Sequence, residues 1–450
     1  MSSRPANSPL VPSETRGLSD DALVDLLQRE AFSYFPETML ETGLVPDSTR
    51  PESPVSIAGV GLGLCAAIVG VARGLLTRGE ALQQALAVLR LFNRSPQGPG
   101  LDTSGHRGFY YHYLDPATHR RAGRCELSSI DTVLLIAGFL TARQFYDRDD
   151  ERELERRELA DALYRRVDWR WMLAGGPTLS HGWRPERGFL NARWAGYTEA
   201  LLLYVLASGS PTFPIARQCY EASTDEYSWT RIYGHDLLYA GPLFIHQLPQ
   251  CWLDLRGISD PWLREHGIDY FENSRRATLV QQTYAVRNPR EFVHYGSCHW
   301  GITASDGPGP SVHVVDGRRR RFWDYKARGV PYGPDDGTVA PWAAVTSLPF
   351  APELVLPTIR KFIADKIGAE ADSTRVGGRS HGFEASVNFS FPCGEDEDCW
   401  RSPWNYALNQ GPLVLMTENY RTGLIWRLLR SCDYVVRGLR GAGFRGAWLD

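Results

Sequence analysis

The chain has 450 residues, with 49 Lys or Arg against 52 Asp or Glu and a net charge of −3. Its 43% hydrophobic residues are typical of a globular protein and not of a disordered or collagen-like chain. The near-neutral balance argues against nucleic acid as the main partner, because phosphate binding needs a concentrated positive face. Eight cysteines without a CxxC pair argue against a disulfide scaffold, although a bridge between Cys393 and Cys399 stays open.

The N-terminal segment differs in composition from the rest of the chain. Residues 1–17 are rich in Ser and Pro and are expected to be a disordered lead, whereas residues 18–450 are expected to form one catalytic domain. The lead has no apolar h-region, so the chain as given predicts a cytoplasmic protein, or a periplasmic one if the start is misassigned. Residues 57–72 are uncharged but too short to span a membrane, so we expect a buried helix there.

Apolar periodicity predicts helices along most of the chain. One begins at Leu18 and meets Pro36, and a capping box of Thr77 and Glu80 precedes another. Residues 57–72 and 129–145 are apolar on all faces, whereas residues 149–166 are charged on most. Further helices are expected at residues 197–207, 243–255, 261–284, 338–346, 352–367 and 405–430. This alternation of buried and charged helices predicts hairpins in an inner and an outer layer, and hence an all-α, single-domain (α/α)6 toroid.

Three long loops, at residues 105–125, 175–194 and 296–337, are rich in Gly and aromatic residues. Loops of this length in a compact domain are usually functional, so we expect them to build one rim of the toroid. Aromatic faces stack on sugar rings, while carboxylates and Arg hydrogen-bond to hydroxyl groups. The mixture predicts carbohydrate binding, although core packing is the simpler interpretation of any single aromatic residue.

Three carboxylates lie among apolar residues at junctions between loops and helices: Glu126, Asp131 and Glu199. A fold can raise the pKa of such a group, as a general acid requires. Glu199 opens the apolar run ALLLYVLA and is expected in the first turn of a helix. Stabilisation of the helix dipole explains an acidic residue at this position equally well.

Other polar residues have local explanations. Asp306 and Asp336 lie beside Gly and Pro, which favours Asx turns, and Asp254 with Arg256 favours a structural ion pair. The His and Cys residues within 294–299 are of metal-ligand type but lack a fourth partner at regular spacing, so no metal is expected.

Several long motifs follow one another in order between residues 23 and 429. They include GFYYHYLD, CELSSIDTVLLIAG, GYTEALLLYVLASGSPT, YGSCHWGITASDGPG and NQGPLVLMTENYRTGLIWRLL. These segments resemble the bacterial glycoamylase-like family that contains endo-β-1,2-glucanases. The resemblance implies an (α/α)6 toroid that hydrolyses β-1,2-linked glucose chains with inversion and without a cofactor. Gln250 stands where a second His is expected, which affects one contact near His246.

We therefore expect an inverting glycoside hydrolase that cleaves β-1,2-glucan to sophoro-oligosaccharides, with a β-glucan as its partner and a monomer as its state. Two enzymatic alternatives stay open: an exo-acting hydrolase that releases sophorose, and a β-1,2-glucan transglycosylase. A non-catalytic glucan-binding protein is the alternative from a different class, and it would keep the aromatic residues and lose the acid.

An inverting hydrolase needs a protonated carboxyl group at the glycosidic oxygen and a carboxylate that activates water on the opposite face. We expect Glu199 to be the acid. Asp131 and Asp306 are the leading candidates for the base, Glu126 follows, and a base acting through a water or a sugar hydroxyl stays open. The glucose subsites are expected to be lined by Tyr111, Trp194, Tyr197, His246, Arg256, Trp300, Asp336 and Arg421.

Overall fold

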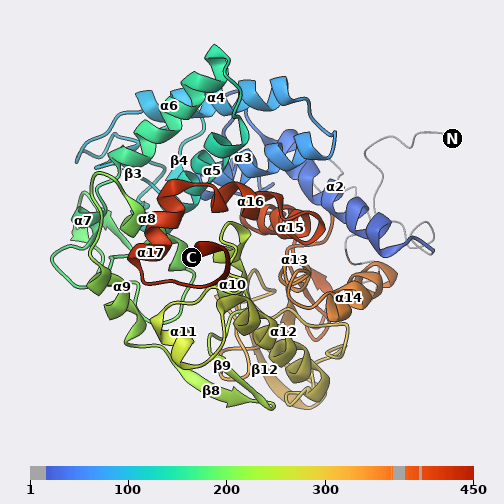
Figure 1. Cartoon of the computed structure of the whole chain (residues 1–450). Helices are drawn as coiled ribbons and strands as arrows, with labels where there is room; N and C mark the ends of the chain where they lie inside the picture. The colour runs from blue at the N-terminus through green and yellow to red at the C-terminus, as the bar shows by residue number, and fades with distance from the viewer. Residues whose placement is uncertain (1–16, 366, 368–380, 395–397) are drawn as a thin grey trace.

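A computed structural model describes residues 17–365, 367, 381–394 and 398–450. Almost all of the expected disordered lead, and part of the acidic loop between Cys393 and Cys399, lie outside these residues. The chain is rich in helices. Those up to residue 421 follow one another around a common centre in the order of the sequence, whereas the helices within residues 424–441 turn back across that centre (Figure 1).

The helices of the first half are α2 Asp20–Thr38, α3 Ile57–Ala72, α4 Arg78–Arg94, α5 Ser129–Phe145, α6 Glu151–Arg166, α7 Trp169–Met172, α8 Leu201–Gly209 and α9 Arg217–Thr224. The bounds predicted for α3 and α5 are confirmed, because serines at positions 56 and 128 cap two uninterrupted apolar runs. The capping box of Thr77 and Glu80 is also present. The helix expected from residue 197 begins only at Leu201, so Glu199 lies in a turn before α8.

The second half contains α10 Phe244–Gln247, the 3₁₀ turn η1 Leu248–Cys251, α11 Pro261–Glu265, α12 Tyr270–Arg287, α13 Pro341–Thr346, α14 Pro352–Ala364, α15 Ala407–Arg421, α16 Leu424–Arg430, α17 Asp433–Gly441 and the 3₁₀ turn η2 Ala447–Leu449. Two long helices predicted here are interrupted. Gly267 separates α11 from α12, and Gly423 separates α15 from α16; both glycines have positive φ.

The helices pack in two layers. The largely buried helices α3, α5 and α15 lie inside, where α5 packs on α3 and α3 packs on α15. Helices α2, α4 and α6 lie outside them (Figure 1). Helices α3 and α5 approach closely where Gly61 and Gly138 face each other: a Cβ on either would overlap with the backbone of the other helix. This close approach explains why glycines interrupt two otherwise apolar helices.

The expectation of an all-α chain needs a correction, because the long loops form short antiparallel strands. They pair as β1 Val55–Ser56 with β4 Tyr113–Leu114; β2 Gly105–His106 with β3 Phe109–Tyr110; β5 Leu127–Ser128 with β6 Gly182–Arg184 and β7 Gly188–Phe189; β8 Trp229–Ile232 with β9 His235–Leu238; β10 Ala304–Ser305 with β13 Lys326–Ala327; β11 Ser311–Val315 with β12 Arg318–Phe322; and β14 Thr338–Val339 with β15 Val387–Asn388 and β16 Trp400–Arg401. Pairing satisfies backbone groups that the loops would otherwise leave unbonded.

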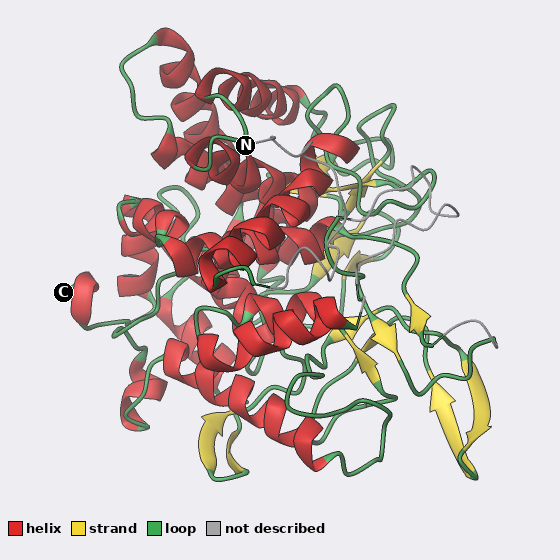
Figure 2. Cartoon of the chain, turned by 90° about the vertical axis from the view of Figure 1, so that its right-hand side faces the viewer, coloured by secondary structure: helices red, strands yellow, loops and turns green. Residues whose placement is uncertain are grey.

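Most of these strands lie on one side of the helices, and the C-terminus lies on the other (Figure 2). We call the two sides the loop end and the C-terminal end. Strands β1 and β5 lead directly into the inner helices α3 and α5, so these helices begin at the loop end. Among the residues that the structure describes, no helix has the length and apolar character needed to cross a membrane.

Candidate active site

Four carboxylates gather at the loop end. They are Asp47 in the loop before β1, Asp131 in the first turn of α5, Glu199 in the turn before α8, and Asp306 directly after β10. Their charges act on one another: Asp131 raises the pKa of Glu199, and Asp131 and Asp306 raise that of Asp47. In the described part of the chain, no Arg or Lys forms an ion pair with any of the four. The cluster therefore brings together three residues predicted from sequence and one that was not.

Glu199 has the properties of a proton donor. Burial and, to a smaller extent, the negative charge of Asp131 raise the pKa of its carboxyl group, its own backbone N–H lowers it, and the net value is about 7. Near neutral pH a substantial fraction of this group is therefore protonated, whereas an ordinary Glu is ionised. A pKa close to the working pH is what general acid catalysis requires.

Glu126 and Asp131 share a histidine. His112 Nδ1 lies 3.1 Å from Glu126 Oε1, and its Nε2 lies 3.5 Å from Asp131 Oδ2. Burial lowers the pKa of His112, but Asp131, Glu126 and Asp47 raise it more, to about 9, so the ring is an imidazolium at neutral pH. The hydrogen bond from His112 in turn lowers the pKa of Glu126 to about 2, with a further contribution from Arg184. Glu126 is thus held as a carboxylate and is unsuited to donate a proton.

Hydroxyl groups donate to one oxygen of Asp131 and to one oxygen of Asp306. Ser128, the N-cap of α5, donates to Asp131 Oδ2 at 2.5 Å. Tyr406 and Ser402 donate to Asp306 Oδ2 at 2.6 and 3.0 Å. Both carboxylates keep an oxygen that these bonds do not use, so either could accept a proton from water.

Asp47 was missed because it lies in a loop rich in Pro and Ser, without an apolar helix beside it. Its main chain is tied to the site from far away in sequence, since the N–H of Ala407 donates to the Asp47 carbonyl at 2.9 Å. Burial, and then the charges of Asp131 and Asp306, raise the pKa of its carboxyl group to about 6, although His112 and Arg50 oppose this. No local sequence pattern signals such a position.

Tyr325 and Tyr113 were also missed, and both face the carboxylates. Tyr325 lies in the turn between β12 and β13 with 67% of its surface exposed, and burial of its hydroxyl and the charges of Glu199, Asp306, Asp47 and Asp131 raise its pKa. Tyr113 stacks on His112 with 4.0 Å between ring centroids. These rings offer apolar faces beside acid and base candidates, which is the arrangement that sugar binding uses.

Some predicted subsite residues lie close to this cluster. Trp194 donates from Nε1 to Ser129 at 2.8 Å and stacks on His181, whose ring centroid is 3.7 Å away. Tyr197, two residues before Glu199, packs against His246 with 5.0 Å between centroids. His246 is fully enclosed, and burial lowers its pKa to about 4, so it is a neutral ring that supports Tyr197.

Other predicted subsite residues are enclosed by protein. Tyr111 and Trp300 are fully buried, and Trp300 donates to Thr358 at 2.9 Å. Asp336 forms an ion pair with Arg328, and neither side chain is exposed. These side chains present no free surface to a sugar, so their positions support loops instead of lining a subsite.

Arg256 and Arg421 lie at the C-terminal end. Arg421 is in the last turn of α15 and donates to Asp25 and Gln28 of α2, both at 2.8 Å. Arg256 pairs with Asp254 at 2.7 Å, and its guanidinium lies over Trp426 of α16. Since α15 begins beside Asp306, its length of about 21 Å, at 1.5 Å per residue, separates Arg421 from the carboxylates.

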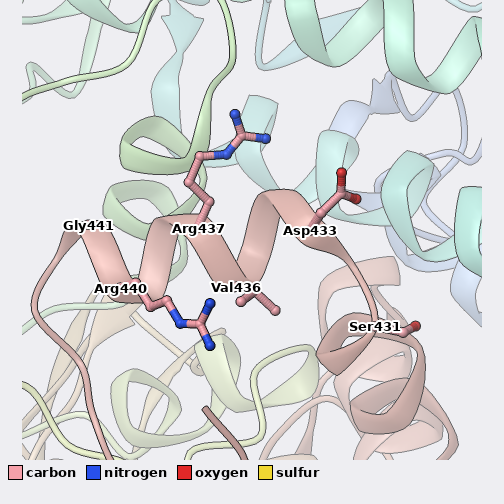
Figure 3. Close-up of a pocket in the computed structure, with 6 residues that line it drawn as sticks. All are labelled: Ser431, Asp433, Val436, Arg437, Arg440 and Gly441. Atoms are coloured by element: carbon pink, nitrogen blue, oxygen red, sulfur yellow. The ribbon is translucent and has the colours of Figure 1, made fainter. Parts of the chain in front are cut away.

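A separate hollow lies on α17 at the C-terminal end (Figure 3). Its lining residues are Ser431, Asp433, Val436, Arg437, Arg440 and Gly441. Helix α17 packs against the end of α8 that is farther from Glu199, where Gly209 and Gly438 allow the two backbones to approach. With one carboxylate and two arginines, this hollow has no pair of acid and base, unlike the loop end.

Within the described residues, no group of three or more His, Cys, Asp or Glu side chains is placed to hold a metal ion. The chemistry that the loop end does offer is proton transfer. Glu199 can give a proton, while Asp131 and Asp306 can accept one, and aromatic rings lie beside them.

Comparison with known proteins gives concordant results. A curated relative from Parabacteroides distasonis, "Exo beta-1,2-glucooligosaccharide sophorohydrolase (non-reducing end)", is 26% identical over 96% of this chain. The chain spans 59% of the length of that relative. An endo-β-1,2-glucanase from Chitinophaga pinensis, whose structure contains sophorotriose and glucose, is 25% identical, covers 96% of this chain and 100% of its own, and has a TM-score of 0.80.

A structure from Bacteroides uniformis, described as a "putative glucoamylase", is 29% identical, with a TM-score of 0.82 and coverage of 96% of this chain and 99% of its own. The Glycoamylase family model, with the description "Putative glucoamylase", matches residues 191–433. This match includes Glu199 and Asp306 and takes in more than half of the 450 residues. The chain therefore belongs to the glycoamylase family.

Proposed function

We propose that this protein hydrolyses β-1,2-linked glucose chains to sophoro-oligosaccharides. The observation that carries the proposal is Glu199, a half-buried residue whose carboxyl group has a pKa of about 7 close to Asp131 at the loop end. The linkage is supported by the named activities of the Parabacteroides and Chitinophaga relatives, which both act on β-1,2-linked glucose.

The proposed reaction is a single displacement with inversion. The carboxyl group of Glu199 donates its proton to the glycosidic oxygen as the C–O bond breaks. On the opposite face Asp131 or Asp306 removes a proton from the attacking water, directly or through a sugar hydroxyl. His112 holds a positive charge beside Asp131 and Glu126, and this charge keeps the Glu126 carboxylate ionised before the reaction. Tyr113 and Tyr325 are proposed to hold glucose rings, with Trp194 and Tyr197 behind them.

The products formed from linear β-1,2-glucan test this proposal. Chromatography of early reaction mixtures should show a ladder of sophoro-oligosaccharides, and NMR of the first product should show the α-anomer before mutarotation. If the glucan remains intact, the protein is a glucan-binding protein without catalytic activity. Cyclic products in place of reducing ends would show transglycosylation.

A second candidate is exo action that releases sophorose from chain ends. The Parabacteroides relative carries this activity in its name, and the alignment covers 96% of the present chain. Exo action would give sophorose alone from the first minutes, with little change in the size of the remaining polymer. The same chromatogram therefore separates the two modes.

We further propose that residues 18–450 form a single catalytic domain that acts as a monomer and has the (α/α)6 topology. The proposed outer–inner pairs are α2–α3, α4–α5, α6–α8, α9–α10, α12–α13 and α14–α15. Cooperative thermal unfolding in one transition, together with a monomer in light scattering, would support both proposals. Two transitions or a stable dimer would contradict them.

A further inference from the structure

The loop that carries Asp306 is built around one enclosed arginine. Arg328 follows β13, and neither it nor its partner Asp336 has any exposed side-chain surface. Arg328 Nε and one terminal nitrogen donate to the two oxygens of Asp336 at 2.7 and 2.8 Å. A bidentate pair of this kind fixes the plane of the guanidinium.

The remaining donors of Arg328 reach backbone on both sides. One terminal nitrogen donates to the carbonyl of Ser305 at 2.7 Å and to that of Asp306 at 3.3 Å. The other donates to the carbonyls of Trp323 and Asp324 at 3.1 and 3.2 Å. One guanidinium thus joins the backbone at Asp306 to the backbone directly before Tyr325.

The strand register brings the same two residues together. In the β10–β13 pair, Ala304 lies opposite Ala327 and Ser305 opposite Lys326. Continuing this antiparallel register places Asp306 beside Tyr325 at the point where both chains leave the ladder. Arg328 hydrogen-bonds to the backbone of both chains at that point.

Two further contacts show that the loop is built to hold this arginine. Asp336 also accepts from the backbone N–H groups of Trp323 and Thr338, at 3.0 and 3.2 Å. Gly307 follows Asp306, and a Cβ at this position would overlap with the Arg328 guanidinium and the carbonyl of Trp323. Glycine is therefore required here by the close approach of the arginine.

We propose that Arg328 is a positioning residue for the glycosidic reaction: with Asp336, it sets Asp306 and Tyr325 at a fixed place relative to Glu199 and Asp131. This inference rests on the proposed function. A buried ion pair is a weak source of stability, because removing both charges from water offsets their attraction. An error of about 1 Å in the place of a reacting group, in contrast, can cost about 10²-fold in rate.

The test is Arg328→Lys, which keeps the positive charge but loses the planar fork and most of the donors. The turnover number is expected to fall by about 10-fold to 10²-fold while KM changes by about threefold or less. Amide hydrogen exchange of peptides covering residues 304–309 and 322–328 is expected to accelerate. The limbs of the pH profile should also move, because Asp306 and Tyr325 would no longer keep their distances from Glu199.

The matched control is Arg73→Lys. Arg73 binds both oxygens of Glu418 at 2.7 and 2.8 Å, and this pair lies at the C-terminal end of α3 and α15. The control should lose stability but keep the turnover number and the pH profile of the wild type. Equal losses of turnover in the two variants would show that Arg328 acts through stability alone and would overturn the proposal.

Two outcomes separate this inference from the proposed function. If the wild type does not hydrolyse the glucan, the proposed function fails, and unchanged exchange in both peptides would independently overturn the positioning role. If Arg328→Lys does not fold, Gly307→Ala displaces the guanidinium without removing a charge. That variant should show the same fall in turnover and the same local exchange, and normal turnover would reject the proposal.

Discussion

Glu199 and Glu153 are two sheltered glutamates at opposite ends of the molecule. Glu199 precedes α8 at the loop end, while Glu153 lies in the first turn of the outer helix α6 at the C-terminal end. Burial raises the pKa of both. Glu153 receives two hydrogen bonds from Arg78, at 2.7 and 2.9 Å, and its pKa is lowered overall. No arginine among the described residues pairs with Glu199, which lies close to Asp131, and its pKa rises to about 7.

The comparison shows that burial alone does not make a glutamate a proton donor. An adjacent guanidinium favours the charged form strongly enough to reverse the effect of desolvation, whereas an adjacent carboxylate adds to it. The same contrast separates the four clustered carboxylates of the loop end from two carboxylates at the C-terminal end. At the C-terminal end Glu418 and Asp254 are bound by Arg73 and Arg256, while the four carboxylates of the loop end have no such partner among the described residues.

The orientation of the inner helices fits this distribution of charge. The loop end collects the N-termini of α3 and α5, where the helix dipole favours negative charge, and Asp131 lies in the first turn of α5. Arg143 and Arg421 lie in the last turns of α5 and α15, where the dipole favours positive charge. The fold can therefore hold the four clustered carboxylates at the loop end with no arginine paired to them among the described residues, which leaves them free for chemistry.

The largest expected effect comes from Glu199→Gln compared with Glu153→Gln. The first keeps the shape of the side chain but removes the proton, so turnover should fall by about 10²-fold or more with substrate binding retained. The second leaves Arg78 poorly paired and should reduce the free energy of unfolding by about 1–3 kcal/mol with turnover unchanged. Steady-state kinetics and urea unfolding of both variants measure this. If Glu199→Gln keeps near-normal turnover, Glu199 only supports the start of α8.

A second comparison lies inside the loop end, between Asp131→Asn and Asp306→Asn. The variant that lacks the base should lose about 10²-fold in turnover on every substrate. Glu199→Gln, in contrast, should recover much of its rate on a glucan oligosaccharide with a nitrophenol leaving group, because that group leaves without protonation. Rates on natural and activated substrates thus separate acid from base. Normal rates in both Asn variants would move the role to Asp47 or Glu126.

The dependence of turnover on pH should follow the titration of Glu199. Its protonated form is the active one, so turnover should fall by about tenfold per pH unit above about pH 7. Glu153 has a lowered pKa and stays charged over this range, so stability should not show the same limb. Turnover that stays constant up to pH 9, in protein shown by circular dichroism to be folded, would contradict the assignment.

His112→Gln should change stability in a pH-dependent way. The pKa of His112 is about 9 in the folded chain against an ordinary value of about 6.5, so the imidazolium stabilises the fold fully below pH 6.5. That contribution is lost as pH rises through about 9. Urea unfolding of variant and wild type should therefore differ by roughly 1–2 kcal/mol at pH 6 and converge near pH 10. A difference that is independent of pH would show that His112 acts through packing.

These residues also show what the sequence could predict. The bounds of α3 and α5 follow from uninterrupted apolar runs behind serine caps, and Glu199 was found because a loop rich in aromatic residues leads into such a run. The apolar runs, the serine caps and the aromatic loop before Glu199 can each be read from a short stretch of sequence. The family resemblance then supplied the activity, which no local pattern carries.

Other features depend on contacts between distant segments. Asp47 is held at the cluster because the backbone N–H of Ala407 donates a hydrogen bond to its carbonyl. Asp336 is enclosed together with Arg328, with which it forms an ion pair. In GFYYHYLD, Tyr111 was selected for the site, yet Tyr111 is enclosed and the next residue, His112, faces the carboxylates. Neighbouring residues of an extended segment face opposite sides, and the sequence does not show which side is the site.

Arg256 and Arg421 test the difference between the ends most directly, because both were predicted to bind glucose and both lie at the C-terminal end. Arg421→Ala removes hydrogen bonds to Asp25 and Gln28, and it should lower the free energy of unfolding by about 1 kcal/mol. Arg256→Ala should cost a similar amount, since Arg430 still pairs with Asp254.

For both variants KM should stay within about twofold of the wild type, because loss of such an ion pair has a small effect and neither side chain lies near the four clustered carboxylates of the loop end. Tyr325→Ala is the control at the loop end, where loss of an exposed aromatic ring should raise KM by about tenfold. A tenfold rise of KM in Arg421→Ala without loss of stability would place a glucose subsite at the C-terminal end. The contrast in charge between the two ends would then not mark where the substrate binds.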